Sequence, residues 1–173
     1  NAHVYGDGGL YGNAEEYVDA GVYGNAQVYG DAWVYGDAWV YGNAQVYGDA
    51  WVYGNAWVYG NAWVYGDAWV CGDARVYNNA QVYGDAQVHG NARVCGDADI
   101  SSDFDYLYFR GFGREARSTT IFRAKDNAIV VKYGCFEGDL QQFERKVHET
   151  HAGTDYELEY MGVIQSAKAH FKV

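Results

Sequence analysis

Residues 31–60 read DAWVYGDAWVYGNAQVYGDAWVYGNAWVYG, five copies of one six-residue unit with few changes. The unit is Ala-x-Val-Tyr-Gly-Asn/Asp, and its valine slot recurs at every sixth position from Val22 to Val94, with Ile100 at the last one. Upstream the slot continues at 4, 10 and 16, which makes 17 slots. A repeat this short cannot bury its own apolar side chains, so it predicts a solenoid whose stacked coils share one core.

Alternation within the unit separates inner from outer side chains. Along a strand formed by Ala-x-Val-Tyr, Ala and Val point to one side, and x and Tyr point to the other. The following Gly-Asn/Asp pair predicts a bend, because glycine adopts positive φ freely and Asn or Asp can bond nearby backbone amides. Glu16 occupies a valine slot and Val18 a glycine slot, so a strained or bulged coil is expected at 14–21.

The pattern Val-Tyr-Gly-Asn-Ala-x over residues 1–103 resembles the hexapeptide-repeat left-handed β-helix, in which a small residue follows an aliphatic residue four positions later. Tyrosine departs from that family, which often has a small or acidic residue there. The resemblance implies a mainly β fold, a left-handed parallel β-helix with three units in each triangular coil of 18 residues. The 17 slots then give five to six coils, and a rod roughly 25–30 Å long at the usual strand spacing.

An 18-residue coil sorts the outward residues into three faces, each with one column at x and one in the tyrosine slot. The tryptophan face carries Glu15, Trp33, Trp51, Trp69 and Gln87 at x, beside Tyr17, Tyr35, Tyr53, Cys71 and His89. The arginine face carries His3, Gly21, Trp39, Trp57, Arg75 and Arg93 at x, beside Tyr5, Tyr23, Tyr41, Tyr59, Tyr77 and Cys95. The glutamine face carries Gly9, Gln27, Gln45, Trp63, Gln81 and Asp99 at x, beside Tyr11, Tyr29, Tyr47, Tyr65 and Tyr83.

Two readings of the aromatic columns stay open. Stacked rings stabilise a sheet through cross-strand pairs worth about 0.2–1 kcal/mol each. Rows of Trp and Tyr also make a larger exposed apolar patch than monomers usually leave open, and these residues dominate interface hot spots. The second reading predicts that a protein partner, or a second copy in a homo-oligomer, docks on Trp33, Trp51, Trp69, Tyr35, Tyr53, Trp39 and Trp57.

The bends form rows of their own. The amide row is Asn25, Asn43, Asn61 and Asn79; the mixed corner is Asp19, Asp37, Asn55, Asp73 and Asn91; the acidic edge is Asp31, Asp49, Asp67 and Asp85. Carboxylates about 5 Å apart repel by about 0.8 kcal/mol per neighbour in water. The acidic edge is therefore either a set of caps for separate bends or a linear array that meets cations or a basic partner, as nucleic-acid phosphates do.

Charge and cysteine content narrow the partners. Residues 1–103 hold 13 acids and two bases, a net charge of −11, whereas residues 104–173 hold ten of each. An acidic rod disfavours direct nucleic-acid binding and anionic membranes, and favours basic or nucleic-acid-handling proteins. Cys71, Cys95 and Cys135 show neither CxxC nor zinc spacing, and no signal peptide or membrane span is visible. We expect a reduced, cytoplasmic setting with no cofactor and no metal site.

After Ile100 the repeat stops, and residues 104–173 predict a small C-terminal α+β module. Strands are expected at 105–112, 119–125 and 128–136, followed by a helix from Leu140 with Asp139 as N-cap and a second helix after Thr154. The stretch around 131–138 resembles the endings of hexapeptide-repeat proteins of gut bacteria and their phages. Three cations of this module lie among aromatic residues: Arg110, Arg123 and Lys132. This pattern indicates either a sheet face that binds an anion or ordinary surface charges in contact with solvent.

Catalysis is not the expected activity. Hexapeptide-repeat acyltransferases use a histidine at a coil edge and loops between units. Residues 22–100 leave no room for a loop, and His89 is the only histidine among them. His148 and His151 suggest no third metal ligand. The sequence predicts a non-catalytic binding protein. One alternative is a phage-borne inhibitor in the host cytoplasm, acting through its acidic edge on a bacterial defence or nucleic-acid-handling protein. The enzyme alternative is an acyltransferase.

Overall fold

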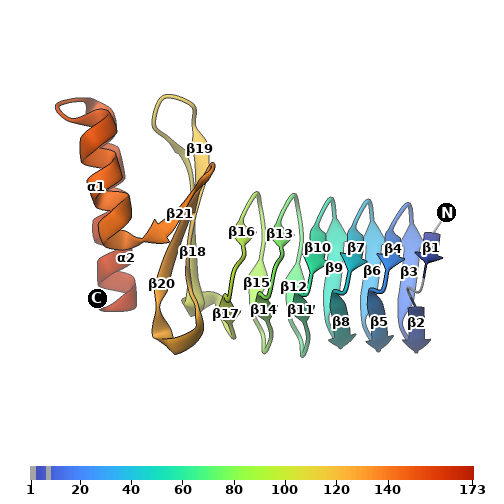
Figure 1. The fold of residues 1–173 in the computed structure, drawn as a ribbon. Helices are drawn as coiled ribbons and strands as arrows, with labels where there is room; N and C mark the ends of the chain where they lie inside the picture. The colour runs from blue at the N-terminus through green and yellow to red at the C-terminus, as the bar shows by residue number, and fades with distance from the viewer. Residues whose placement is uncertain (1–2, 7–8) are drawn as a thin grey trace. The chain divides into compact units, whose positions relative to one another are not determined.

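The computed structural model describes residues 3–6 and 9–173, with the side chains of 3–5 and 16–18 outside the described set (Figure 1). The predicted places of His3, Tyr5 and Tyr17 in the outer columns therefore lie outside what is described. Two compact units make up the chain, Asn1–Asp103 and Phe104–Val173. We call them the solenoid and the C-terminal module.

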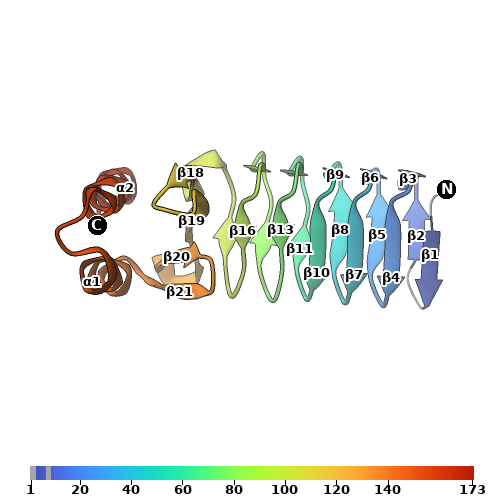
Figure 2. The same ribbon diagram turned by 90° about the horizontal axis from the view of Figure 1, so that it is seen from above.

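The solenoid consists of short strands stacked in three parallel sheets, one for each face (Figures 1 and 2). The arginine face contains β1 (His3–Gly6), β4 (Gly21–Gly24), β7 (Trp39–Gly42), β10 (Trp57–Gly60), β13 (Arg75–Val76) and β16 (Arg93–Val94). The glutamine face contains β2 (Gly9–Gly12), β5 (Gln27–Gly30), β8 (Gln45–Gly48), β11 (Trp63–Val64), β14 (Gln81–Val82) and β17 (Asp99–Ile100). The tryptophan face contains β3 (Glu15–Val18), β6 (Trp33–Gly36), β9 (Trp51–Gly54), β12 (Trp69–Val70) and β15 (Gln87–Val88).

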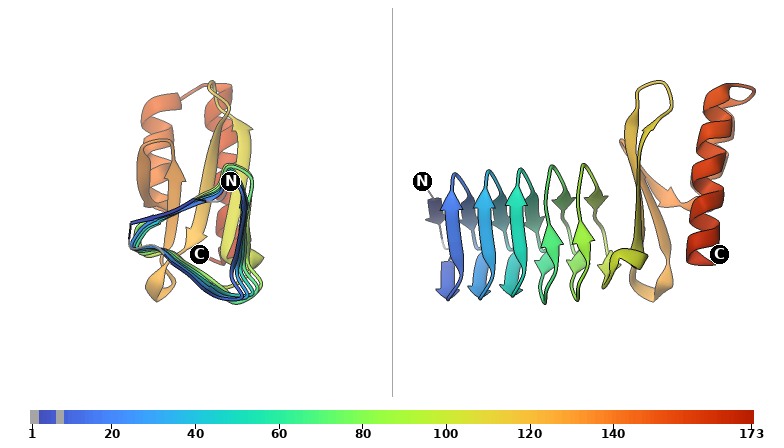
Figure 3. Two further views of the ribbon diagram at one scale, coloured as in Figure 1. Left: turned by 90° about the vertical axis from the view of Figure 1, so that its right-hand side faces the viewer. Right: turned by 180° about the vertical axis from the view of Figure 1, so that it is seen from behind.

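Every pairing in the solenoid joins residues 18 apart, as in Trp39↔Trp57 between β7 and β10. Viewed along its axis, the coils superpose on one triangle (Figure 3). The prediction of a mainly β parallel solenoid of five to six coils is thus confirmed, and its handedness stays a prediction. The prediction of a bulge at 14–21 is wrong for the strand in this stretch. There β3 pairs with β6 in unbroken register from Glu15↔Trp33 to Val18↔Gly36. The side chains of Glu16 and Val18 lie outside the described residues.

The core of the solenoid is built from two small residues per unit. Every repeat alanine from Ala20 to Ala98 and every valine from Val22 to Val94 has no exposed surface. The strands start one residue later than predicted, at x, because the alanine belongs to the corner. Corner amides continue the hydrogen-bond ladder, as when Asp49 N–H donates to the Gly66 carbonyl at 3.0 Å. Each coil is therefore bonded to the next through both its flat sides and its bends.

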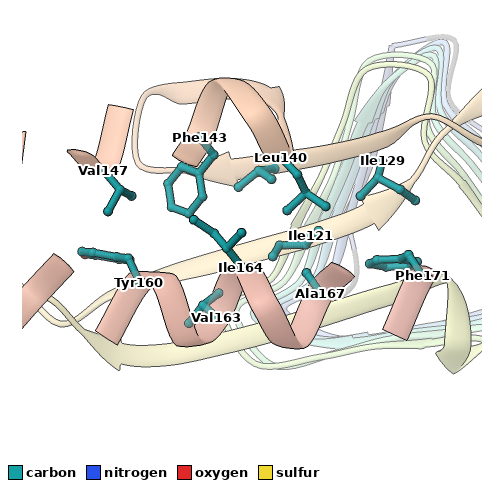
Figure 4. Packing of buried hydrophobic residues seen from close by; sticks show 11 residues of the cluster. Ile121, Ile129, Leu140, Phe143, Val147, Tyr160, Val163, Ile164, Ala167 and Phe171 are labelled. Atoms are coloured by element: carbon teal, nitrogen blue, oxygen red, sulfur yellow. The ribbon is translucent and has the colours of Figure 1, made fainter. Parts of the chain in front are cut away.

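The C-terminal module is a four-stranded antiparallel sheet with two helices. Its elements are β18 (Tyr106–Phe112), β19 (Arg117–Arg123), β20 (Ile129–Tyr133), β21 (Phe136–Asp139), α1 (Leu140–His151) and α2 (Asp155–Phe171), with 3-10 turns at Asp103–Asp105 and Lys125–Asn127. The single strand expected at 128–136 is instead broken by a turn at Gly134 and Cys135, where Gly134 has a φ of +57°, and a new strand begins at Phe136. Helices and sheet share one core around Ile121, Phe143 and Ile164 (Figure 4).

The starts of the two helices follow different rules. Asp139, the predicted N-cap of α1, forms a capping box with Gln142. Gln142 N–H donates to Asp139 Oδ1 at 2.7 Å, and Asp139 N–H donates to Gln142 Oε1 at 2.9 Å. For α2, the N-cap Thr154 makes no side-chain cap bond. The Glu157 carboxylate accepts instead from Gly153 N–H at 2.7 Å and meets His148 Nδ1 at 2.5 Å, which lowers the pKa of Glu157. Within the described residues, neither helix is long and apolar enough to cross a membrane.

Candidate functional site: the aromatic faces of the solenoid

On the tryptophan face, the three indoles form one column, as the 18-residue coil predicts. Trp33 and Trp51, and then Trp51 and Trp69, stack with ring centroids 5.4 Å apart and planes 11° apart. Beside them Tyr35 and Tyr53 stack at 5.0 Å and 2°. Because the flat faces of stacked rings turn toward one another, mostly their edges face water. The result is a continuous aromatic ridge, in which Trp69 keeps 37% of its surface exposed.

The two columns of a face interlock diagonally between coils. Tyr35 meets Trp51 edge to face at 6.1 Å and 78°, and Tyr53 meets Trp69 in the same way at 6.2 Å and 74°. Where glutamine replaces tryptophan at x, a hydrogen bond takes the place of the ring contact: Tyr29 Oη donates to Gln45 Oε1 at 3.2 Å. On the tryptophan face, Trp51 is thus held by stacked indoles on both sides and by the edge of Tyr35, which makes this surface rigid.

Several stacked tyrosines of the solenoid have raised pKa values and so keep their protons well above neutral pH. Burial raises the pKa of Tyr35 and Tyr47 above the usual 10.0. A hydrogen bond with Cys71, with burial as a second cause, raises the pKa of Tyr53 to about 12. The described faces therefore present neutral aromatic edges, and the charge of the solenoid lies mainly at its corners.

The corner rows differ in how their side chains are used. The amide row is bonded along the stack, with Nδ2–H of Asn25, Asn43 and Asn61 each donating to Oδ1 of the next asparagine at 3.0–3.2 Å. On the acidic edge, Asp31 accepts from Asn13 at 2.8 Å. Asp49, Asp67 and Asp85 are exposed, and their side chains make no hydrogen bond or ion pair within the described part of the chain. The capping interpretation thus has no support at these three positions.

The acidic edge borders the tryptophan face. Asp49 and Asp67 each precede a tryptophan of this face by two residues, so the acidic edge lies at the corner that leads into the column. The mixed corner, which includes Asp37 and Asp73, follows the same strands. The tryptophan column therefore runs between two rows that contain carboxylates.

The arginine face has the second aromatic column. Tyr23 stacks on Trp39 at 5.2 Å, Trp39 on Trp57 at 6.0 Å, and the Arg75 guanidinium lies 4.9 Å from the Trp57 ring centroid. A shallow groove of about 270 Å³ lies between Tyr41 and this column. The glutamine face has an unbroken tyrosine stack at 4.9–5.0 Å, formed by Tyr29, Tyr47, Tyr65 and Tyr83.

The structure does not bring the three cations predicted in the C-terminal module together. Arg123 Nε donates to Asp105 Oδ1 at 3.0 Å, and its guanidinium lies over Phe171 of α2. Lys132 pairs with Glu137 at 3.0 Å, and strand alternation places it on the sheet face opposite the helices. Arg110 is exposed on β18. Two of the three charges thus already have carboxylate partners.

Histidines of the module also have defined surroundings. His148 contacts Glu157, and the His151 ring stacks on Tyr160 at 5.4 Å. No group of three His, Cys, Asp or Glu side chains suited to a metal ion occurs among the described residues. The sequence did not single out Tyr23 and Tyr41, which line the groove with Trp39 and Trp57, nor Gly21, which makes room for the Tyr23 ring. The signal available in the sequence was a glycine where most coils have a large x side chain.

Comparison with known proteins supports the fold alone. A family profile described as YdcK Beta solenoid repeat matches residues 20–36, 26–42, 44–60, 56–72, 68–84 and 74–90. The matches all lie in the solenoid, and each covers nearly one coil. No match was found among curated proteins or among solved structures. The chain is therefore similar to a β-solenoid repeat to which the match attaches no activity.

Proposed function

We propose that this chain is a non-catalytic binding protein whose tryptophan face docks a protein partner. One observation carries the proposal: the stacked column of Trp33, Trp51 and Trp69 borders the acidic edge, three of whose four carboxylates have no partner within the described residues. A partner that fits this surface presents apolar or aromatic side chains flanked by lysine and arginine. Apolar anchors then contact the indole edges while the cations meet the Asp rows.

Rigidity supports this proposal. Side chains that are mobile before binding lose entropy when they dock, at about 0.5–1.5 kcal/mol each. The stacked and interlocked rings of the tryptophan face are already ordered, so that cost falls on the partner alone. The acidic rows also raise the rate at which a basic partner meets the face, and this contribution is expected to weaken with salt.

Self-assembly through the same face is less favoured by its charge. Two copies placed face to face would bring four rows with carboxylates together, and the solenoid carries a net charge of −11. Repulsion between copies falls as salt screens it. Sedimentation of the full chain at low and high salt distinguishes a second copy of the chain from a different partner on this face. Dimers that form at low salt and disappear in Trp51→Ala would support a homo-oligomer.

The test of the proposal uses peptides displayed on phage and selected against the full chain. Enriched peptides are expected to combine aromatic or aliphatic residues with Lys or Arg. Trp51→Ala should weaken their binding by at least about tenfold, equivalent to 1.4 kcal/mol. Trp63→Ala is the control, because it removes an exposed indole from the glutamine face. Equal effects of the two substitutions, or enrichment of acidic peptides, would refute the proposal.

A second candidate is the inhibitor that acts through the acidic edge. It is favoured by the exposure of Asp49, Asp67 and Asp85, whose carboxylates follow one another at the coil spacing of about 4.8 Å. Phosphates of one DNA strand follow at 3.4 Å of rise, so the match is one of charge rather than of rung-by-rung position. Joint replacement of Asp49 and Asp67 by Lys should abolish binding of an arginine-rich peptide through this edge, whereas Trp51→Ala should leave it unchanged.

The acyltransferase alternative has a direct test of its own. An acyl-CoA site stabilises the folded state by mass action when its ligand is in excess. A thermal shift of the full chain on addition of acetyl-CoA would support the enzyme and count against purely non-catalytic binding. We expect no shift.

A further inference from the structure

Gly21 interrupts the x column of the arginine face, and the neighbouring tyrosine fills its place. A Cβ added at Gly21 would lie 2.3 Å from Cε2 of Tyr23, so the tyrosine ring covers the space of a larger x side chain. Tyr23 then stacks on Trp39 with planes 26° apart. The equivalent pair one coil further on, Tyr41 and Trp57, meets edge to face at 76°. The ring of Tyr23 has therefore turned toward Trp39 and Trp57, the two tryptophans of the arginine face.

This turn leaves room beside Tyr41. The groove of about 270 Å³ is lined by Tyr23, Trp39, Tyr41 and Trp57, four aromatic rings. Tyr41 stacks on Tyr59 at 4.9 Å and 1°, so one flat side of its ring is already used. Carbon atoms pack at about 3.5–4.0 Å, and successive coils lie about 4.8 Å apart. A flat ring on the other side of Tyr41 thus continues the tyrosine stack by one position.

The charge suited to this groove can be inferred from the same face. On the other side of the Trp39–Trp57 pair, the flat guanidinium of Arg75 lies 4.9 Å from the Trp57 centroid. Aromatic faces attract cations, by about 0.5–1 kcal/mol at exposed sites. Asp37, exposed at the corner that leads into this face, precedes Trp39 by two residues. Both the rings and the nearby carboxylate favour a positive ligand.

We propose that the groove formed by Tyr23, Trp39, Tyr41 and Trp57 binds a small planar aromatic cation, stacked on the ring of Tyr41 in the place left by Tyr23. The site takes one ligand per chain, because the glutamine face, where Tyr11 also lies over Gly9, has Gln27 and Gln45 in place of the two tryptophans. It lies on the arginine face and shares only the corner of Asp37 with the tryptophan face, so its four rings stay free when a protein docks over Trp51.

The experiment titrates the full chain with thioflavin T, a planar aromatic cation, by calorimetry and fluorescence. One equivalent should bind, with the largest changes in the indole N–H signals of Trp39 and Trp57 among the tryptophans. Anilinonaphthalene sulfonate, a planar aromatic anion, should bind at least about tenfold more weakly. Several equivalents per chain, or equal binding of the anion, would show adsorption along the ladders and overturn the proposal.

Variants of two equivalent glycines give the matched test. Gly21→Gln displaces the Tyr23 ring back over Tyr41 and should weaken binding at least about tenfold. Gly9→Gln makes the same change on the glutamine face, where a Cβ would lie 2.4 Å from the Tyr11 ring, and should leave binding unchanged. Tyr41→Leu keeps an apolar side chain but removes the stacking ring, and it should also weaken binding. This variant tests the site if Gly21→Gln loses its β circular dichroism and so does not fold. Wild-type affinity in Tyr41→Leu, or an equal loss in Gly9→Gln, would disprove the site.

Discussion

Single residues decide whether a six-residue unit can turn its corner. The fifth residue of the unit has positive φ throughout most of the solenoid, as in Gly54 at +73°. Glycine adopts this region without steric cost, and asparagine does so more readily than other residues with a Cβ. Asn78 occupies the same slot at φ +64°. The repeat itself therefore shows that asparagine can replace glycine at this corner.

Substitution at Gly54 separates backbone strain from side-chain size. Gly54→Ala should destabilise the solenoid by about 1–2 kcal/mol, because alanine at positive φ is strained. Its Cβ would also lie 3.1 Å from the Gly72 nitrogen. Gly54→Asn should cost less although asparagine is larger. Urea unfolding followed by tryptophan fluorescence measures the difference, and an asparagine variant less stable than the alanine variant would contradict it.

Among the elements, the columns of stacked rings couple each strand to the next. The neutral state of stacked tyrosines is part of that coupling, since burial raises the pKa of Tyr35 and Tyr47 and disfavours their phenolates. The corner rows act in opposite ways: amides bond along the stack, while carboxylates repel along it. Pair energies of this kind are small singly and add up over the coils.

Alkaline pH should therefore unfold the solenoid. A group whose pKa is raised in the folded state contributes stability that is complete below its unfolded pKa and is lost as pH rises through its folded pKa. For Tyr53 that window runs from 10.0 to about 12. Tyrosinate absorbance and tryptophan fluorescence should change together in this range. Titration of all tyrosines near pH 10 with fluorescence unchanged would contradict the expected coupling.

Asp67→Asn should stabilise the solenoid by about 1 kcal/mol. The change removes repulsion from neighbouring carboxylates. It also supplies an amide donor to Asp85, as Asn55 supplies one to Asp73 at 3.0 Å. Asn61→Asp is the converse control and should destabilise, because it removes the bond to Asn79. Midpoints of urea unfolding compare the two, and a less stable Asp67→Asn would show that the acidic edge is neutralised in another way.

The chain taken together is electrically asymmetric. The net charge of −11 belongs to residues 1–103, and residues 104–173 are neutral overall. All six tryptophans lie in the solenoid, between Trp33 and Trp69, so their fluorescence reports on that unit alone. Helical circular dichroism reports on the C-terminal module, where the described helices α1 and α2 lie.

Salt should stabilise the two units unequally. Raising the salt concentration from about 10 mM to about 0.5 M shortens the screening length from tens of ångströms to a few and weakens repulsion along the acidic rows. The thermal midpoint followed by tryptophan fluorescence should rise by several degrees. The midpoint followed by helical circular dichroism should rise less. Equal shifts of the two signals would indicate a general salt effect instead.

Much of this fold could be predicted because a six-residue period leaves little freedom. Strand alternation places Ala and Val inward, and 18 residues per coil place Trp33, Trp51 and Trp69 in one column. The helix starting at Leu140 was also predictable, because its capping box is local in sequence. The strand β21 was not, since only a two-residue turn at Gly134 and Cys135 separates it from β20.

The sequence alone settled which side chains share a face and which lie in the core, because backbone periodicity and glycine sterics act within each unit. The tertiary structure alone decided how the outer side chains turn. Tyr23 moves over Gly21, and Arg123 and Lys132 find carboxylates on opposite sides of a sheet. The physical reason is that a ring or a charged group chooses its rotamer by the partner in the next coil or strand, and that partner is fixed only once the chain has folded.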